Sequence, residues 1–163
     1  MKAWWLIVIV TVFYLFVVNL FWPIEKKVLP PSTRKTAANG YAQAEVIFSD
    51  QHLRVRVPTT VQLQEKGLAG VDTLSDSEGM LWIYTAPQRV AFWMKGMLIP
   101  LDFVWISDGH IVDLTENVPP PASAVSTDLP IIDPGVPIND VLEVAGGYVQ
   151  RHSLKVGDVA QVQ

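Results

Sequence analysis

The sequence predicts an all-β domain, a compact antiparallel sandwich or barrel, preceded by one N-terminal transmembrane helix. Two observations support this prediction: 20 uncharged residues from Ala3 to Trp22, and a series of short apolar segments separated by turn residues after about residue 42. Strands at short, regular spacing are typical of antiparallel β architectures. We therefore divide the chain into an anchor (1–22), a linker (23–41) and a β domain (42–163).

The uncharged run is long enough to cross a bilayer, because its 20 residues would form a helix of about 30 Å. Aromatic residues stand at both ends, where a membrane-interface belt is expected: Trp4, Trp5, Phe21 and Trp22. A cleaved signal peptide is the competing interpretation, but the run exceeds a usual signal core and no small-x-small site follows Trp22. We expect an uncleaved anchor and a single-pass membrane protein.

The segment Pro23 to Gly40 is typical of a linker, because proline and Asn39-Gly40 interrupt regular structure. The first expected strands are Glu45–Phe48 and His52–Val57. In the second, alternation places Leu53, Val55 and Val57 on the inner face. Thr59-Thr60 is predicted to cap a short helix that runs to Gln64 or Lys66 and ends at Gly67.

The rest of the domain is predicted to consist of strands joined by turns and one long loop. Further strands are expected at Met80–Tyr84, Val90–Met94, Leu101–Ile106, His110–Leu114, Val141–Ala145 and Val159–Val162. Predicted turns lie at Asp76–Gly79, Pro87-Gln88, Ser107-Asp108-Gly109 and Gly146-Gly147. Ser107-Asp108-Gly109 is predicted to be a hairpin turn, because glycine accepts the positive φ that such turns need. The proline-rich segment Val118–Asp140 is expected to be a surface loop.

Composition excludes several classes of function. The chain has no cysteine, which removes disulfides, thiolate catalysis and cysteine-type zinc sites. The formal charge is +4 before Tyr41 and −8 from Tyr41 onward. Nucleic-acid binding depends on Lys and Arg that neutralise phosphates, so an acidic domain argues against a nucleic-acid partner.

Several motifs, taken in order, resemble the domain of unknown function 192 family. They are Gly67-Leu68, Gly79-Met80-Leu81-Trp82, Phe92-Trp93-Met94-Lys95 with Pro100-Leu101-Asp102, Asp108-Gly109 with Ile111-Val112, Val141-Leu142-Glu143-Val144 with Ala145-Gly146, and Lys155-Val156-Gly157-Asp158. The resemblance covers about residues 44–161. It implies a jelly-roll-like all-β fold in an exported or membrane-anchored setting, and it implies no established activity.

This chain departs from the family pattern at two places. Ala69-Gly70 stands where the family usually has Met and a basic residue, and Gly96-Met97 stands where Asn-Thr often follows. If these positions shape a ligand site, the site of this chain differs there.

Two observations bear on the orientation of the β domain in the membrane, and they favour opposite sides. The resemblance favours an extracytoplasmic β domain in the cell envelope. The count of Lys and Arg near the uncharged run argues the other way, because Lys26, Lys27, Arg34 and Lys35 follow the run and Lys2 alone precedes it.

Four residues are candidates for a ligand site: Trp93, Lys95, Asp102 and Glu143. Trp93 follows Phe92 directly, so on a strand the two side chains point to opposite faces and one of them is exposed or lines a pocket. Asp102 is expected to be solvated, hydrogen-bonded to loop amides, or partly buried. Glu143 alternates with Leu142 and Val144 and faces solvent or a cleft. The two carboxylates could instead form an acid/base pair.

No metal site and no cofactor are expected. The methionines Met80, Met94 and Met97 lack a nearby His or Cys and are read as core residues. The leading hypothesis is a membrane-anchored, non-enzymatic domain that binds a small ligand or an envelope partner near Trp93, Lys95 and Asp102. The alternatives are a hydrolase-like enzyme that uses Asp102 and Glu143, and a purely structural envelope component.

Overall fold

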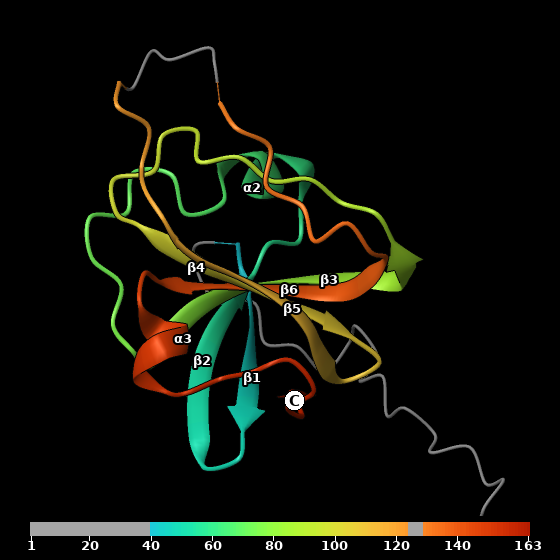
Figure 1. The fold of residues 1–163 in the computed structure, drawn as a ribbon. Helices are drawn as coiled ribbons and strands as arrows, with labels where there is room; N and C mark the ends of the chain where they lie inside the picture. Colours follow the sequence, from blue (N-terminus) through green and yellow to red (C-terminus); the bar gives the residue numbers. More distant parts are fainter. Residues whose placement is uncertain (1–39, 124–128) are drawn as a thin grey trace, which may run out of the picture. The chain divides into compact units, whose positions relative to one another are not determined.

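The computed structural model describes residues 40–123 and 129–163, so the predicted anchor and most of the linker lie outside the described residues. Its elements are β1 (Ala42–Phe48), β2 (Gln51–Val57), α2 (Val61–Lys66), β3 (Glu78–Gln88), β4 (Leu101–Ser107), β5 (His110–Val118), β6 (Ile138–Ala145), α3 (Tyr148–Arg151) and β7 (Gln161–Val162) (Figure 1). In the described ranges no helix has the length and apolar character needed to cross a bilayer. The prediction of an all-β domain is confirmed as a mostly β fold.

The described strands form one mixed sheet in the order β5-β4-β6-β3-β2-β1-β7. Of the predicted sandwich and barrel, a single curled sheet fits only the barrel-like alternative. The predicted purely antiparallel pairing is wrong, because β2 and β3 pair in parallel. The parallel pair arises because the chain between Val57 and Glu78 carries α2 across one face of the sheet before it returns (Figure 1). A tight turn would have made the two strands antiparallel.

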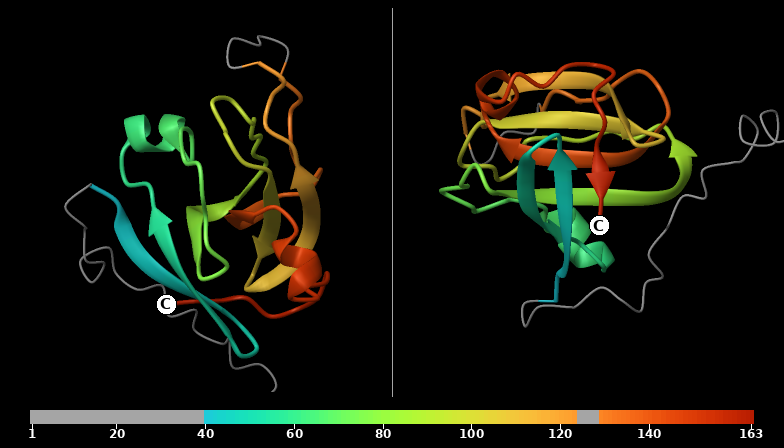
Figure 2. Two further views of the ribbon diagram at one scale, coloured as in Figure 1. Left: turned by 90° about the vertical axis from the view of Figure 1, so that its left-hand side faces the viewer. Right: turned by 90° about the horizontal axis from the view of Figure 1, so that it is seen from below.

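The sheet curls into a half-barrel, and β1 and β2 turn toward the inner face of the remaining strands (Figure 2). The chain from Gly157 to Val162 links the two ends of the curl. Ala160 N–H donates to the Gly109 carbonyl at 2.9 Å next to β5, and Ile47 of β1 pairs with Gln161 of β7. The predicted closing strand is therefore confirmed, although its regular part is only Gln161–Val162.

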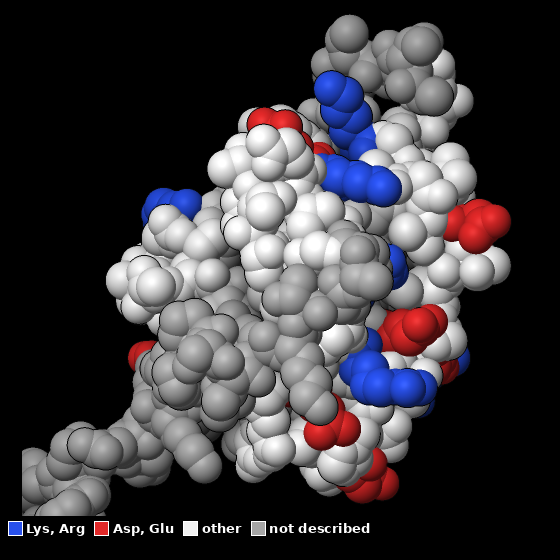
Figure 3. Space-filling model, turned by 180° about the vertical axis from the view of Figure 1, so that it is seen from behind, with Lys and Arg blue, Asp and Glu red and all other residues white. Residues whose placement is uncertain are grey.

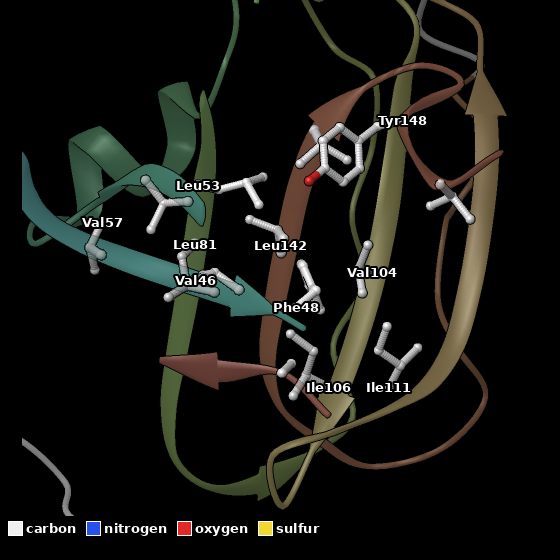
Figure 4. Close-up of a cluster of buried hydrophobic side chains, with 14 of the residues drawn as sticks. Val46, Phe48, Leu53, Val57, Leu81, Val104, Ile106, Ile111, Leu142 and Tyr148 are labelled. Atoms are coloured by element: carbon white, nitrogen blue, oxygen red, sulfur yellow. The ribbon is translucent and has the colours of Figure 1, made fainter. Parts of the chain in front are cut away.

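The inside of the curl is an apolar core to which all the larger strands contribute (Figure 4). Its buried side chains include Val46, Leu53, Leu81, Val104, Ile106, Ile111 and Leu142, with Tyr148 of α3. The predicted inner face of the second strand is confirmed, because Leu53, Val55 and Val57 are all buried there.

The opposite face of the central strands carries a second core that is rich in aromatic and methionine side chains. Its sheet residues include Met80 and Trp82 of β3, Leu101, Phe103 and Trp105 of β4, and Val141 of β6. Leu63 of α2 and side chains from the connection after it, together with Met94, Met97 and Ile132, cover this core. The methionines are thus core residues, as the sequence predicts.

Local signals placed the short helix and the hairpin correctly. Thr60 Oγ1 accepts a hydrogen bond from Leu63 N–H at the start of α2, and Gly67 ends the helix with φ 50°. The β4–β5 hairpin turns at Asp108 and Gly109, which have φ 52° and 76°. Two consecutive positive φ values are the geometry of a tight hairpin turn.

Three local predictions are wrong. The chain does not turn at Pro87-Gln88, because β3 continues to Gln88 through an irregular stretch of its ladder with β6. Val90–Met94 is not a strand, since β3 already lies between β6 and β2; Phe92 forms only an isolated bridge with Ile132. The helix α3 follows Gly147 where the sequence predicts no helix.

Gly79 permits the close approach of β3 and β6. A Cβ at this position would lie 2.8 Å from the Glu143 carbonyl oxygen. We expect Gly79→Ala to lower the free energy of unfolding by about 2 kcal/mol, because a backbone atom in a packed sheet cannot move aside. Urea unfolding measures the change. Thr85→Ala, at an exposed position of the same strand, is the control, and an equal loss in both variants would contradict the steric explanation.

Candidate functional site

The four candidate residues do not form a single site. Cross-strand pairing places Asp102 opposite Val144 and places Glu143 opposite Phe103. Because side chains alternate along each strand, Asp102 lies on the inner face with Val104, and Glu143 lies on the aromatic face with Val141. The two carboxyl groups are therefore on opposite sides of the sheet and cannot act together as an acid/base pair.

Asp102 is a structural residue. Its side chain is fully buried and accepts three backbone N–H groups: Oδ1 from Asn117 at 2.6 Å and from Gly147 at 3.0 Å, and Oδ2 from Val149 at 2.8 Å. Gly147 is the N-cap of α3 and has no side chain to cap the helix. Asp102 supplies the missing acceptor from a distant strand. Of its three predicted environments, hydrogen bonding to backbone amides is the one observed, although Asn117 lies in β5 and Val149 in α3 rather than in loops.

Glu143 lies on the aromatic face of the sheet and is only 2% exposed. It lies on β6 between Met80 of β3 and Phe103 of β4, and its Oε2 atom has no hydrogen-bond partner among the described residues. Burial is the main cause that raises its pKa, to about 8 from an ordinary 4.5. The carboxyl group is therefore mostly protonated at neutral pH. Of the two predicted environments for Glu143, solvent or a cleft, its burial excludes solvent.

Trp82 is the polar neighbour of Glu143. Its indole N–H lies close enough to lower the pKa of the carboxyl group in part, yet neither Trp82 Nε1 nor Glu143 Oε2 forms a hydrogen bond of good geometry. Trp105 on the same face is satisfied, because its Nε1 donates to Thr115 Oγ1 at 2.9 Å. Two adjacent buried polar groups without partners are unusual, since each costs about 1–3 kcal/mol.

Aromatic rings surround this polar pair. The Phe92 ring has its centroid 5.0 Å from that of Trp82 on β3, 5.9 Å from that of Phe103 on β4 and 5.8 Å from that of Trp105. Because β6 runs between β3 and β4, the Phe92 ring, which contacts rings on both of these strands, lies across the aromatic face of β6. We call Glu143, Trp82, Phe92, Phe103 and Trp105 the Glu143 site.

Two loops form the cover near this site, and they touch at the positions where the chain departs from the family pattern. Gly70 N–H donates to the Gly96 carbonyl at 2.9 Å, and a Cβ on Gly96 would lie 3.2 Å from the Ala69 Cβ. A Cβ on Gly67 would lie 3.7 Å from both Trp82 and Met97. The small residues at 69–70 and 96 therefore allow the cover to close tightly beside Trp82.

Trp93 and Lys95 lie on the outer surface of the same cover. The Trp93 side chain is 55% exposed, whereas Phe92 packs inward, so the two neighbours point in opposite directions as predicted. The bridge between Phe92 and Ile132 places Trp93 beside Ile131, which is 71% exposed. Trp93 and Lys95 thus follow Phe92 closely in the chain, but their side chains lie on the outer rim of the Glu143 site.

A separate polar hollow of about 520 Å³ lies between the β1–β2 turn and residues 151–159. None of the four candidate residues lines it. Beside it Arg151 binds Asp76 at 2.7 Å, and this hydrogen bond is the main cause that lowers the pKa of Asp76. Basic and acidic side chains are interspersed on the face seen in Figure 3. Arg151 and His152, which line the hollow, are already paired with Asp76, so the hollow is a weaker candidate.

Sequence reasoning missed Trp82 and Phe92 as members of the site. Trp82 lies in a strongly apolar strand, so its sequence context shows only a core residue. Phe92 and Trp93 are neighbours, but the sequence does not show which of them points inward. Only the strand order, which brings β3 and β4 to the two sides of β6, reveals both residues as neighbours of Glu143.

Comparison with known proteins supports the family assignment and the fold. A family model described as DUF192, an uncharacterized ACR, matches residues 44–162. Solved structures from Sinorhizobium meliloti 1021, provisionally assigned as a transcription regulator, and from Novosphingobium aromaticivorans DSM 12444, of unknown function, are similar to this chain. The first is 29% identical with TM-score 0.63 and covers 74% of this chain and 92% of its own.

The second structure is 27% identical with TM-score 0.65 and covers 76% of this chain and 88% of its own. No functionally curated protein matches the chain. The family model spans most of the chain, and its bounds agree with the extent of the motifs read from the sequence. The chain therefore belongs to the domain of unknown function 192 family (DUF192).

Proposed function

We propose that this protein is a membrane-anchored binding module that takes a small ligand at the Glu143 site, without hydrolytic activity. One observation carries the proposal: Glu143 Oε2 and Trp82 Nε1 are buried side by side within a cluster of aromatic rings, and neither forms a hydrogen bond of good geometry. Replacing such a pair with apolar side chains of similar volume would stabilise a purely structural core. A positively charged or polar ligand group would compensate the buried acid, and aromatic side chains with a few polar groups are typical of ligand sites.

The alternative functions fit the geometry less well. A hydrolase that uses Asp102 and Glu143 would need both carboxyl groups beside one substrate, and the sheet separates them. A purely structural envelope component would need no polar pair inside the second core. Ligand binding therefore explains why this core contains the destabilising polar pair of Glu143 and Trp82, and the alternatives do not explain it.

Thermal-shift measurements on the full chain in detergent micelles test the proposal. The wild type is screened with sugars, peptides, organic acids and organic cations, in parallel with Glu143→Gln and Trp82→Phe. We expect at least one class to raise the melting temperature of the wild type and to have a smaller effect on both variants. Glu65→Gln, in the exposed helix α2, is the matched control. Equal ligand shifts in all four proteins would place the binding elsewhere, and no shift in any would contradict the proposal.

Trp93 provides a test of the rim. Its indole is 55% exposed, so we expect Trp93→Ala to change the free energy of unfolding by less than about 0.5 kcal/mol. The same change is expected to weaken binding at least threefold, because the exposed ring would contact a ligand or partner at the edge of the cover. Titration calorimetry and urea unfolding separate the two effects. A large loss of stability would show that Trp93 is a core residue.

We further propose that Ala3–Trp22 anchors the domain outside the cytoplasm. The uncharged run has the length of a bilayer span, although the basic residues after it favour the opposite orientation. Because the chain has no cysteine, a single Thr85→Cys change on β3 provides a unique label site. Labelling of intact cells by an impermeant maleimide is expected. Labelling only after lysis would reverse the proposed orientation, and recovery of the protein in the soluble fraction would exclude the anchor.

A further inference from the structure

We propose that the ligand of the Glu143 site is an organic cation without N–H donors, such as a quaternary ammonium group, held between the Glu143 carboxylate and the aromatic rings. This inference rests on the proposed function and names the class of ligand. Its physical basis is the combination of one buried carboxyl group and several ring faces, which together favour a large, weakly hydrated positive charge.

The surroundings of the Glu143 carboxyl favour a positively charged ligand. Among the described residues, no Lys or Arg acts on the Glu143 carboxyl, and the polar group that favours its ionised form is the Trp82 indole N–H. An ionised Glu143 would thus have a hydrogen-bond donor but no counterion. A buried carboxylate needs a positive partner to remain charged. A cationic ligand would supply that partner.

The aromatic rings favour a cation as well. Phe103 lies directly beside Glu143, whereas Trp82 and Trp105 flank Val141, the next residue on the same face of β6. The Phe103 and Trp105 rings are stacked at 5.7 Å between centroids. Ring faces attract cations electrostatically by about 0.5–2 kcal/mol, and Trp is the strongest partner. The flanking rings would therefore stabilise a cation that lies over β6.

Ligands with several N–H groups fit this site poorly. A primary ammonium has three donors, each of which needs an acceptor when it is buried. Apart from the phenols of Tyr41 and Tyr84, the described side chains that form this core are hydrocarbon, thioether, phenyl or indole groups, which accept such bonds poorly. A quaternary ammonium has no N–H group, so burial leaves none of its atoms unsatisfied.

The route of entry is the cover. Phe92 occupies the space over β6, and its backbone is held to Ile132 by two hydrogen bonds of 2.9 and 3.0 Å. On its C-terminal side the cover is a short turn in which Met97 N–H donates to the Met94 carbonyl at 3.1 Å. Methionine side chains adapt easily to a new shape. We therefore expect the ligand to enter by displacing the Phe92 ring.

Binding would be coupled to loss of a proton. Burial raises the pKa of Glu143 to about 8, so at pH 7 the free site is mostly protonated and its proton passes to the buffer when a cation binds. Affinity should rise about tenfold per pH unit between pH 6 and 7 and level off above pH 8. Tyr84 on β3 is the described titratable group that faces Glu143, and it stays neutral in this range because burial raises its pKa to about 12.

Titration calorimetry on the full chain, in a maltoside detergent without choline head groups, tests the inference. The probes are choline and benzyltrimethylammonium, with the neutral isosteres in which carbon replaces nitrogen. At pH 7.5 we expect each cation to bind at least tenfold more tightly than its isostere. Glu143→Gln should abolish this preference, whereas Glu65→Gln should retain it. Titration in two buffers of different ionisation enthalpy should show release of a proton.

Several outcomes would overturn the inference. Equal binding of a cation and its isostere, or an unchanged preference in Glu143→Gln, would show that positive charge is not recognised. If neither cation binds but a neutral compound stabilises the wild type and not Trp82→Phe, the ligand class is wrong and the proposed binding function stands. If no compound of any class binds, both fail. Circular dichroism confirms that each variant is folded.

Discussion

Asp102→Asn is expected to destabilise the domain by about 4 kcal/mol or more. The side chain is fully buried and accepts hydrogen bonds from Asn117, Gly147 and Val149. The amide of asparagine has one oxygen, so its NH₂ group would face at least one backbone N–H. Each buried donor that loses its acceptor costs about 1–3 kcal/mol, and bonds to a charged acceptor are the stronger kind.

The loss is expected to concentrate at α3. Two of the three bonds hold the start of this helix, and Tyr148 and Val149 fill the inner core beside it. Hydrogen exchange should therefore show that amides of residues 147–152 lose protection in Asp102→Asn before those of β3. Urea unfolding gives the total change.

Asp133→Asn is the matched control for this experiment, because Asp133 accepts one bond from Gly135 N–H at 2.7 Å in an exposed loop. Its replacement should cost less than about 0.5 kcal/mol. A similarly small cost at Asp102 would show that water replaces the carboxylate, and the structural role assigned to this residue would be wrong.

The sequence predicts the parts of the fold that depend on local chemistry. Thr60 and Gly67 bound α2 because capping and positive φ are properties of single residues. The alternation in β2 and the turn at Gly109 follow for the same reason. These elements need no knowledge of the rest of the chain, and all of them are confirmed.

The errors have a common physical cause, which is contact between segments distant in the chain. The helix α3 has four residues, too few to show a pattern, and it is stabilised by Asp102, 47 positions before Val149. The segment around Phe92 has strand-like residues, but no sheet edge is free beside it. Asp102 and Glu143 lie on opposite faces of the sheet because of the register in which β4 pairs with β6. The sequence does not reveal this register.

Glu143→Gln is expected to change how stability depends on pH. In the folded protein burial raises the pKa of Glu143 to about 8, whereas its ordinary value is 4.5. Between these values the folded state holds a proton that the unfolded state has released. The contribution of Glu143 to the free energy of unfolding of the wild type should therefore be greatest below pH 4.5. It should fall as the pH rises toward 8.

The separation of the two pKa values corresponds to roughly 4–5 kcal/mol across this range. Asp76 and Glu78 act in the opposite direction, since hydrogen bonds from Arg151 and Ser75 lower their pKa values. Their contribution changes only as the pH falls through and below the ordinary carboxyl range. Glu143→Gln leaves every other titratable group of the chain unchanged, so the difference between its curve and that of the wild type isolates the contribution of Glu143.

Glutamine has the shape of a protonated glutamate but cannot ionise, so Glu143→Gln should match the wild type near pH 5. At pH 8 it should be more stable than the wild type by roughly 4 kcal/mol. Urea unfolding at pH 5, 6, 7 and 8 measures both curves, with Glu65→Gln as the exposed control that should follow the wild type. Parallel curves for wild type and Glu143→Gln would mean that the carboxyl group is hydrated or paired in solution. The buried, unpartnered acid on which the binding site depends would then not exist.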